Sequence, residues 1–161
     1  MQHMLNNDAD IDYIFPLDAD EFIYCPSREK LNTFLTLIPQ NRVGMYTWRG
    51  YLPHSTEYDP DFISHFTDQR KEEILTPKVI IPRAIAETCT LTIGSHSVRD
   101  KEGKEVQSIV FIGSNNQQFY YWFINRFNAE FIETNDLWLG HYPIRSTIQQ
   151  IKKVLEKSIT M

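Results

Sequence analysis

Three carboxylates fall within four positions of one short stretch, FPLDADEFIY, as Asp18, Asp20 and Glu21. In an extended chain successive side chains alternate, so Asp18 and Asp20 are expected to point the same way. Two neighbouring carboxylates repel unless a cation lies between them. Hard divalent metals prefer oxygen ligands, particularly where a phosphate completes the coordination sphere. The spacing therefore predicts a Mn²⁺ or Mg²⁺ site held by Asp18 and Asp20.

The residues around the carboxylates favour this site over a solvated, inert acidic turn, which is the alternative. Residues 11–23 are expected to contain the strand that carries the aspartates, with a continuous apolar run from Tyr13 to Leu17. Ligands commonly bind at the carboxyl ends of strands in open α/β sheets. Phe22 and Ile23 follow at once, and carboxylates in apolar surroundings need a partner.

The other elements expected from the sequence make a single domain over residues 1–161 that mixes helices and strands. A helix should begin after Ser27 as N-cap and end before Pro39, because its apolar residues recur at helical spacing. The remaining predictions are strands at 43–51, 78–82, 88–93 and 106–112, a turn at 101–105, and helices at 115–127 and 146–158. The fold class is therefore α/β.

Composition narrows the possible partners. The 161 residues are 42% hydrophobic and carry a formal net charge of −5, which describes a globular chain and argues against nucleic-acid binding. No apolar run reaches the roughly 18 residues of a membrane span, and the N-terminus lacks a signal peptide. We expect a cytoplasmic protein with no transmembrane segment, or one peripheral to the inner membrane, with Cys25 and Cys89 reduced.

Three stretches together resemble one family of enzymes. FPLDADEFIY resembles the DxD segment of glycosyltransferases with the A-type fold, and is similar to the family 2-like bacterial and family 92-like groups, whose motif commonly reads D-x-D-E-F. LTIGSHSV at 91–98 agrees with it, and GHYPIRSTIQQIKK at 140–153 is similar to the closing H-Y-x-x-[RK]-S segment. The resemblance implies the C-terminal portion of this Rossmann-like fold, a mixed sheet flanked by helices. The N-terminal nucleotide-binding half is expected to be missing, leaving little activity.

The resemblance also implies a reaction: metal-dependent, inverting transfer of a sugar from a nucleotide-sugar donor to a hydroxyl of a glycan or saccharide acceptor. Asp20 would bind the metal most directly, and Asp18 would contact the ribose or reach the metal through water. Either His96 or His141 would add a ligand, and the sequence does not choose between them. Glu21 either orients its neighbours by hydrogen bonding or is a surface acid.

Further donor contacts are expected at the start of the last helix. Arg145 and Ser146 precede it, where free backbone N–H groups and the helix dipole favour anions. Arg145 is expected to bind a phosphate with two parallel hydrogen bonds. Lys153 lies further along the same helix and is the third residue assigned to the donor phosphates.

The catalytic base stays unassigned. An inverting enzyme needs a carboxylate that deprotonates the acceptor hydroxyl, and the weak candidates are Glu57, Asp59, Asp61 and Asp68. Trp48 and Tyr51 are either sugar-stacking or core aromatics.

Two other functions remain open. One is a non-catalytic module that binds a sugar nucleotide or a metal. The other is a metal-dependent phosphotransferase with Asp18 as nucleophile, although such sequences normally continue with Gly-Thr where Glu21 and Phe22 stand here.

Overall fold

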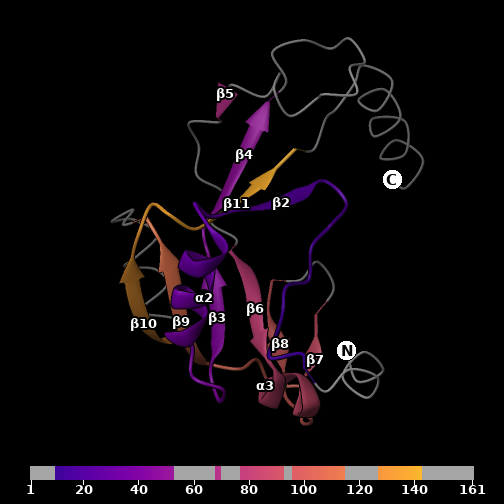
Figure 1. The fold of residues 1–161 in the computed structure, drawn as a ribbon. Helices are drawn as coiled ribbons and strands as arrows, with labels where there is room; N and C mark the ends of the chain where they lie inside the picture. The colour runs from indigo at the N-terminus through magenta and orange to yellow at the C-terminus, as the bar shows by residue number, and fades with distance from the viewer. Residues whose placement is uncertain (1–9, 53–67, 70–76, 93–95, 115–126, 143–161) are drawn as a thin grey trace, which may run out of the picture.

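The computed structural model describes residues 10–52, 68–69, 77–92, 96–114 and 127–142. The elements are β1 (Tyr13–Ile14), β2 (Glu21–Tyr24), α2 (Arg28–Thr36), β3 (Val43–Tyr46), β4 (Trp48–Leu52), β5 (Asp68–Gln69), β6 (Lys78–Pro82), α3 (Arg83–Thr88), β7 (Thr90–Leu91), β8 (Val98–Arg99), β9 (Ser108–Gly113), β10 (Asn128–Glu133) and β11 (Trp138–His141). Strands predominate in this part of the chain, and the fold is mixed α/β (Figure 1).

The larger sheet has five strands in the order β1-β6-β3-β9-β10. β3, β9 and β10 are parallel, whereas β6 runs antiparallel to both of its neighbours, β1 and β3. As a result, the carboxyl ends of β1, β3 and β9 and the amino end of β6 meet at one edge. The Asp18–Asp20 segment, which follows β1, and the start of β4, which follows β3, both lie at this edge. The sequence predicted the aspartates at the carboxyl end of a strand, and they are found there.

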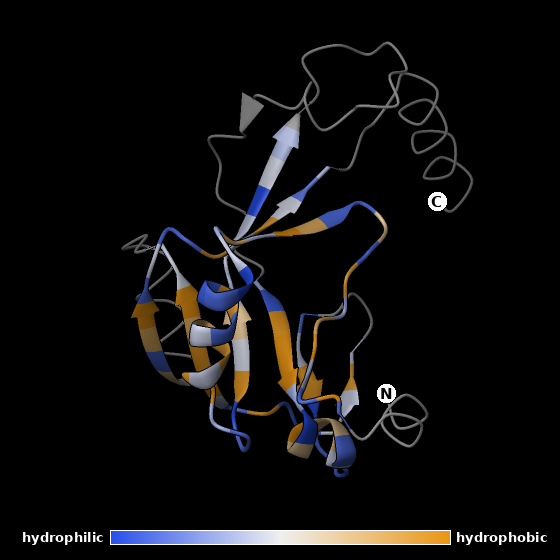
Figure 2. Cartoon of the chain, in the orientation of Figure 1, coloured by the Kyte–Doolittle hydropathy of each residue, from blue (hydrophilic) through white to orange (hydrophobic). Residues whose placement is uncertain are grey.

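Both faces of this sheet are covered, as expected of strands that are apolar throughout. One face packs against Phe34 of α2 and against Ile38, which follows the helix; both join a core that includes Tyr46, Ile80 and Val110. The other face carries a second core built around Val79, Ile109 and Phe111, to which α3 contributes Ala86. Figure 2 shows this concentration of hydrophobic residues in β6 and β9, in contrast to β4.

A second sheet lies beyond that edge, with the strand order β2-β11-β4-β5 (Figure 1). Its central strand β11 is antiparallel to β2 and parallel to β4. In this register His141 lies opposite both Glu21 and Gly50. The sheet therefore brings together the two ends of the described chain. A third sheet is the small β7-β8 hairpin.

Several predicted elements are confirmed. α2 begins directly after Ser27, whose Oγ accepts a hydrogen bond from Lys30 N at 3.2 Å. The 78–82 strand is β6, and its five residues are all buried. The charged turn is present, with Gly103 at φ 79°. The predicted strand at 106–112 corresponds to β9, which begins two residues later, at Ser108.

Other predictions were wrong. Residues 43–51 do not form one strand, because the chain passes at Thr47 from β3 in the larger sheet to β4 in the second. Residues 11–23 are likewise divided into β1 and β2 by a turn. Thr88 ends a short helix, α3, and within the described part of the strand expected at 88–93 the strand β7 comprises Thr90 and Leu91.

The predicted helices at 115–127 and 146–158 lie outside the described residues, apart from Phe127. Among the helices that the structure describes, none has the length and apolar character needed to cross a membrane.

Candidate functional site

The carboxylate segment is held as a turn by Glu21. Its backbone N–H donates to Asp18 O at 3.0 Å, and its side-chain Oε2 accepts from Asp18 N at 2.9 Å. Glu21 is 5% exposed. Of the two roles considered for this residue, the structure therefore shows the orienting one. Because the segment turns here, the alternation expected of an extended chain does not apply to Asp18 and Asp20.

Lys78 is the cation of this cluster. Its Nζ lies 3.0 Å from Asp18 Oδ2 and 3.1 Å from Glu21 Oε1. The Lys78 side chain is 1% exposed and that of Glu21 is 2% exposed, whereas that of Asp18 is 61% exposed. A buried charge is stable only when paired, so the pair with Glu21 explains how an otherwise apolar buried strand can begin with lysine.

Asp20 has a different environment from Asp18. Its Oδ2 lies 3.7 Å from His141 Nε2, and its backbone oxygen accepts from Tyr142 N at 2.9 Å. Both side chains of the Asp20–His141 pair are 19% exposed. The backbone bond and the β2–β11 ladder fix the position of His141, so two motif segments from opposite ends of the chain become neighbours here.

Trp48 connects the two candidate histidines. Its ring centroid lies 4.5 Å from that of His141 and 5.9 Å from that of His96. His96 Nδ1 lies 3.0 Å from Pro77 O; because a carbonyl oxygen only accepts, this nitrogen is the donor. Trp48 also packs against the α2-facing core, which is the structural role considered for it.

Three consecutive residues at the junction of β3 and β4 carry buried polar side-chain atoms. Tyr46 is fully buried and is the register partner of Lys78. Burial raises the pKa of the Tyr46 phenol well above its usual value, and the charge of Glu21 raises it further. Within the described part of the chain, three consecutive residues, Tyr46, Thr47 and Trp48, have a buried side-chain N or O atom without a hydrogen-bond partner.

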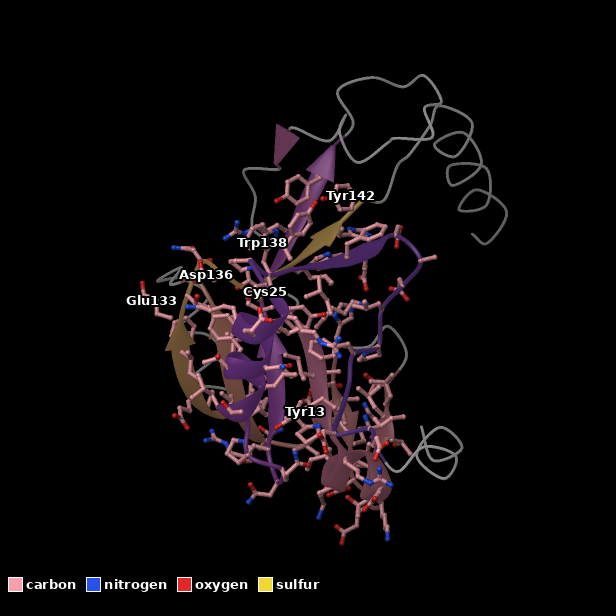
Figure 3. The ribbon with its side chains drawn as sticks, in the orientation of Figure 1. Tyr13, Cys25, Glu133, Asp136, Trp138 and Tyr142 are labelled. Carbon is pink, nitrogen blue, oxygen red and sulfur yellow. The ribbon has the colours of Figure 1, made fainter. Side chains whose placement is uncertain are left out.

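The opposite face of the second sheet is aromatic. The Tyr142 hydroxyl lies 2.7 Å from that of Tyr24, and the ring of Tyr142 stacks on Tyr51 at 5.1 Å. Trp138 stacks on Tyr24, and Arg49 lies over its ring at 4.3 Å. Figure 3 labels Trp138, at the start of β11, and Tyr142, which directly follows this strand. Burial raises the pKa of the Tyr142 phenol, and the hydrogen bond with Tyr24 adds to this shift. Tyr51 thus stacks within the protein.

The geometry allows a metal at Asp20 and His141. Two ligand atoms that are each about 2.1 Å from a shared ion lie about 3 to 4 Å apart, and Asp20 Oδ2 and His141 Nε2 are 3.7 Å apart. A carboxylate with an imidazole is a less favourable ligand set for Mn²⁺ or Mg²⁺ than a set made of oxygen atoms alone. No three His, Cys, Asp or Glu residues within the described ranges form a group able to hold a metal.

The remaining predicted site residues are only partly covered. Asp68 is in β5, where its backbone pairs with Leu52, and its side chain is not described. The other base candidates and the donor-binding residues of the last helix lie outside the described residues; they are Glu57, Asp59, Asp61, Arg145, Ser146 and Lys153. These assignments stay predictions.

Sequence analysis missed Lys78 and Tyr46 as members of this cluster. For Lys78 a signal was present, because KVIIP places a lysine at the start of an otherwise apolar strand, and such a lysine requires an acidic partner. Tyr46 gave no comparable signal.

Comparisons with protein-family models, with curated proteins and with solved structures returned no match.

Proposed function

We propose that this chain carries the metal and diphosphate site of a glycosyltransferase with the A-type fold. In this proposal it transfers a sugar from a nucleotide-sugar donor to a hydroxyl of a glycan or saccharide acceptor. The observation that carries the proposal is the proximity of Asp20 to His141, with Glu21 and His141 paired in register. The segments that resemble the family's DxD and H-Y motifs thus lie next to each other, as a common site requires.

Asp20 and His141 would hold the Mn²⁺ or Mg²⁺ ion. When bound, such an ion stabilises the negative charge that develops on a departing nucleoside diphosphate. The residues of this chain contribute the framework. Glu21 fixes the turn that carries Asp20, and the Tyr142–Asp20 backbone bond holds His141 beside it. Of the two histidines, we assign the ligand role to His141, because its Nε2 lies 3.7 Å from Asp20 Oδ2, whereas Nδ1 of His96 is bonded to Pro77 O.

The test is calorimetric titration of the chain with Mn²⁺, alone and with a nucleoside diphosphate such as UDP or GDP. We expect saturable Mn²⁺ uptake that is abolished by Asp20→Asn and by His141→Ala. Asp12→Asn is a suitable control, because Asp12 is exposed and precedes β1. Unchanged uptake in both site variants would contradict the proposal. Release of free sugar from a panel of nucleotide sugars then measures turnover.

A non-catalytic module that binds a metal or a sugar nucleotide is the second candidate. It would hold the ion with the same Asp20–His141 pair, 3.7 Å apart, but would lack a base that deprotonates an acceptor. Saturable Mn²⁺ and nucleoside diphosphate binding without turnover of any nucleotide sugar would support this module. Any turnover that depends on Asp20 would support the transferase.

A further inference from the structure

The two faces of the second sheet have different roles. Across β2, β11 and β4, the residues Ile23, Leu139 and Trp48 are paired in register, and all three pack against the α2-facing core. Side chains alternate along a strand, so the residues between them belong to the other face. A sheet that covers a core on one face is usually polar on the other. Here that other face is aromatic, and we call it the aromatic face; its side chains are Phe22, Tyr24, Arg49, Tyr51, Trp138 and Tyr142.

The rings of the aromatic face are fixed relative to one another. The planes of Tyr24 and Trp138 differ by 2°, and those of Tyr51 and Tyr142 by 11°. The hydrogen bond between the hydroxyls of Tyr24 and Tyr142 joins the two pairs. Between them lies Gly140, where a Cβ would come within 2.9 Å of the rings of both tyrosines. A surface that is ordered in advance loses little entropy when a ligand binds.

Arg49 gives the aromatic face a positive charge. Its guanidinium carbon lies 4.3 Å from the ring centroid of Trp138, and the side chain is half-buried. Stacking occupies the plane of a guanidinium and leaves the N–H donors along its edge. Within the part of the chain that the structure describes, these donors take part in no hydrogen bond or ion pair. Two parallel N–H groups match the oxygens of a carboxylate, so the face offers an oxyanion site beside aromatic rings.

We propose that the aromatic face binds an acidic saccharide through a uronic acid unit. The carboxylate of this unit pairs with Arg49, and its apolar C–H surface packs on the half-buried rings of Tyr24, Tyr51 and Trp138. The inference rests on the proposed function for the choice of a saccharide, and deepens it by making the saccharide acidic. The formal net charge of −5 disfavours a polyanion such as nucleic acid, so the ligand carries few charges.

The aromatic face adjoins the candidate site without sharing its side chains. His141 alternates with Tyr142 along the chain and therefore belongs to the face that carries Leu139 and Trp48. The saccharide is thus bound on the opposite side of β11 from the histidine. Its binding does not require an ion at Asp20 and His141, so it is measured without one.

The experiment is a calorimetric titration of the 161-residue chain with trigalacturonate, in the presence of EDTA. Two matched ligands separate the contributions. The methyl ester of trigalacturonate keeps the sugar rings but has no charge, and an acetylated and amidated triglutamate keeps three carboxylates but has no sugar ring. We expect saturable binding of trigalacturonate, with dissociation constants at least about tenfold higher for both matched ligands, because a hydrogen bond to a charged group is lost in one and the ring contacts in the other.

Substitutions at Arg49 test the assigned partner. Arg49→Gln should raise the dissociation constant for trigalacturonate about tenfold. Arg49→Lys should recover only part of this loss, because lysine keeps the charge but not the planar pair of donors. The control is Arg28→Gln, which removes an exposed arginine at the start of α2 and should leave the constant unchanged. Circular dichroism first shows that each variant is folded.

The outcomes distinguish this inference from the proposed function. A wild-type chain that binds no trigalacturonate, or that binds it no more tightly than the ester, would overturn the acidic saccharide. Equal binding of triglutamate would do the same and would point to an anionic peptide. Unchanged binding in Arg49→Gln would remove Arg49 from the contact and overturn the inference. Failure of the Mn²⁺ titration, with trigalacturonate binding intact, would overturn the metal site alone.

Discussion

The ammonium of Lys78 lies 3.1 Å from Glu21 Oε1 at the edge where the two sheets meet, and both side chains are almost fully enclosed. β6 supplies the lysine and β2 the glutamate, so this ion pair links one sheet to the other. The carboxylate turn is attached to the same pair through the bond from Asp18 N to Glu21 Oε2. Both the stability and the shape of the site therefore depend on two residues.

Removing one charge of the Lys78–Glu21 pair should lower the free energy of unfolding more than removing both charges. We expect Glu21→Ala to lower the free energy of unfolding by about 3–5 kcal/mol, because it leaves the Lys78 ammonium buried with its inner partner gone. The double variant Lys78→Met/Glu21→Gln should lose clearly less stability than Glu21→Ala. Urea denaturation of the three proteins measures the difference, and a double variant less stable than Glu21→Ala would contradict the expectation.

The buried Tyr46 hydroxyl should be dispensable. It has no hydrogen-bond partner among the described residues, so Tyr46→Phe should raise the free energy of unfolding by about 1 kcal/mol at neutral pH. Tyr142→Phe is the contrasting variant, because that hydroxyl is paired with Tyr24 at 2.7 Å, and it should be less stable than wild type. A loss of stability in Tyr46→Phe would show that the hydroxyl has a partner.

Tyr46 also predicts how stability changes in alkali. Burial and the Glu21 charge raise the pKa of the phenol in the folded state, whereas an unfolded tyrosine has a pKa of about 10. Stability is therefore complete below pH about 10 and falls above it, because the unfolded chain loses the proton first. Tyr46→Phe should unfold at a higher pH than wild type in an alkaline titration followed by circular dichroism. An identical transition would argue against a buried phenol at this position.

Gly113 and Thr47 should show coupled substitutions. A Cβ at Gly113 would clash with Thr47 Oγ1 and would lie 3.0 Å from Phe111 Cε1. Gly113→Ala is therefore expected to cost about 1–3 kcal/mol. Thr47→Ala removes a buried hydroxyl that has no partner within the described ranges, and should make the alanine at 113 better tolerated. A double-mutant cycle by urea denaturation measures the coupling, and strictly additive effects would show that the two positions do not interact.

The N-cap of α2 gives a prediction independent of the site. Ser27 Oγ accepts from Lys30 N, so Ser27→Ala should lower the free energy of unfolding by about 1 kcal/mol. Ser27→Asp retains an acceptor and should stay close to wild type. Thermal denaturation of the two variants checks the cap, and equal losses in both would point to another role for the hydroxyl.

The elements that could be predicted from sequence are those with strong local signals. The Ser27 cap and the helical spacing after it identified α2, and the apolar run at 78–82 identified β6. The break at Thr47 was not predictable, because residues on both sides are β-prone and the change of sheet is set by long-range pairing: Leu139 N donates to Thr47 O at 2.7 Å.

At the site, the residue types were predictable but their pairing was not. Asp18, Asp20 and His141 were identified from motifs, and the structure brings Asp20 and His141 together. The assumption of an extended chain failed because Glu21 forms two hydrogen bonds with Asp18 that make this segment a turn. The spacing of the carboxylates does not predict these bonds. Lys78 was missed for a related reason, since its partners lie about sixty residues away in the sequence.

The place of β11 between β2 and β4 has a consequence for how the protein is made. Tyr24 and Tyr142 are in contact although they are 118 positions apart. β2 can therefore pair only after β11, the last described strand, has been synthesised. Pairings of such long range form slowly, because the intervening loop must close first. During synthesis on the ribosome the larger sheet can begin to form from β3, β6 and β9, while the DxD turn stays without its histidine until translation has passed residue 141.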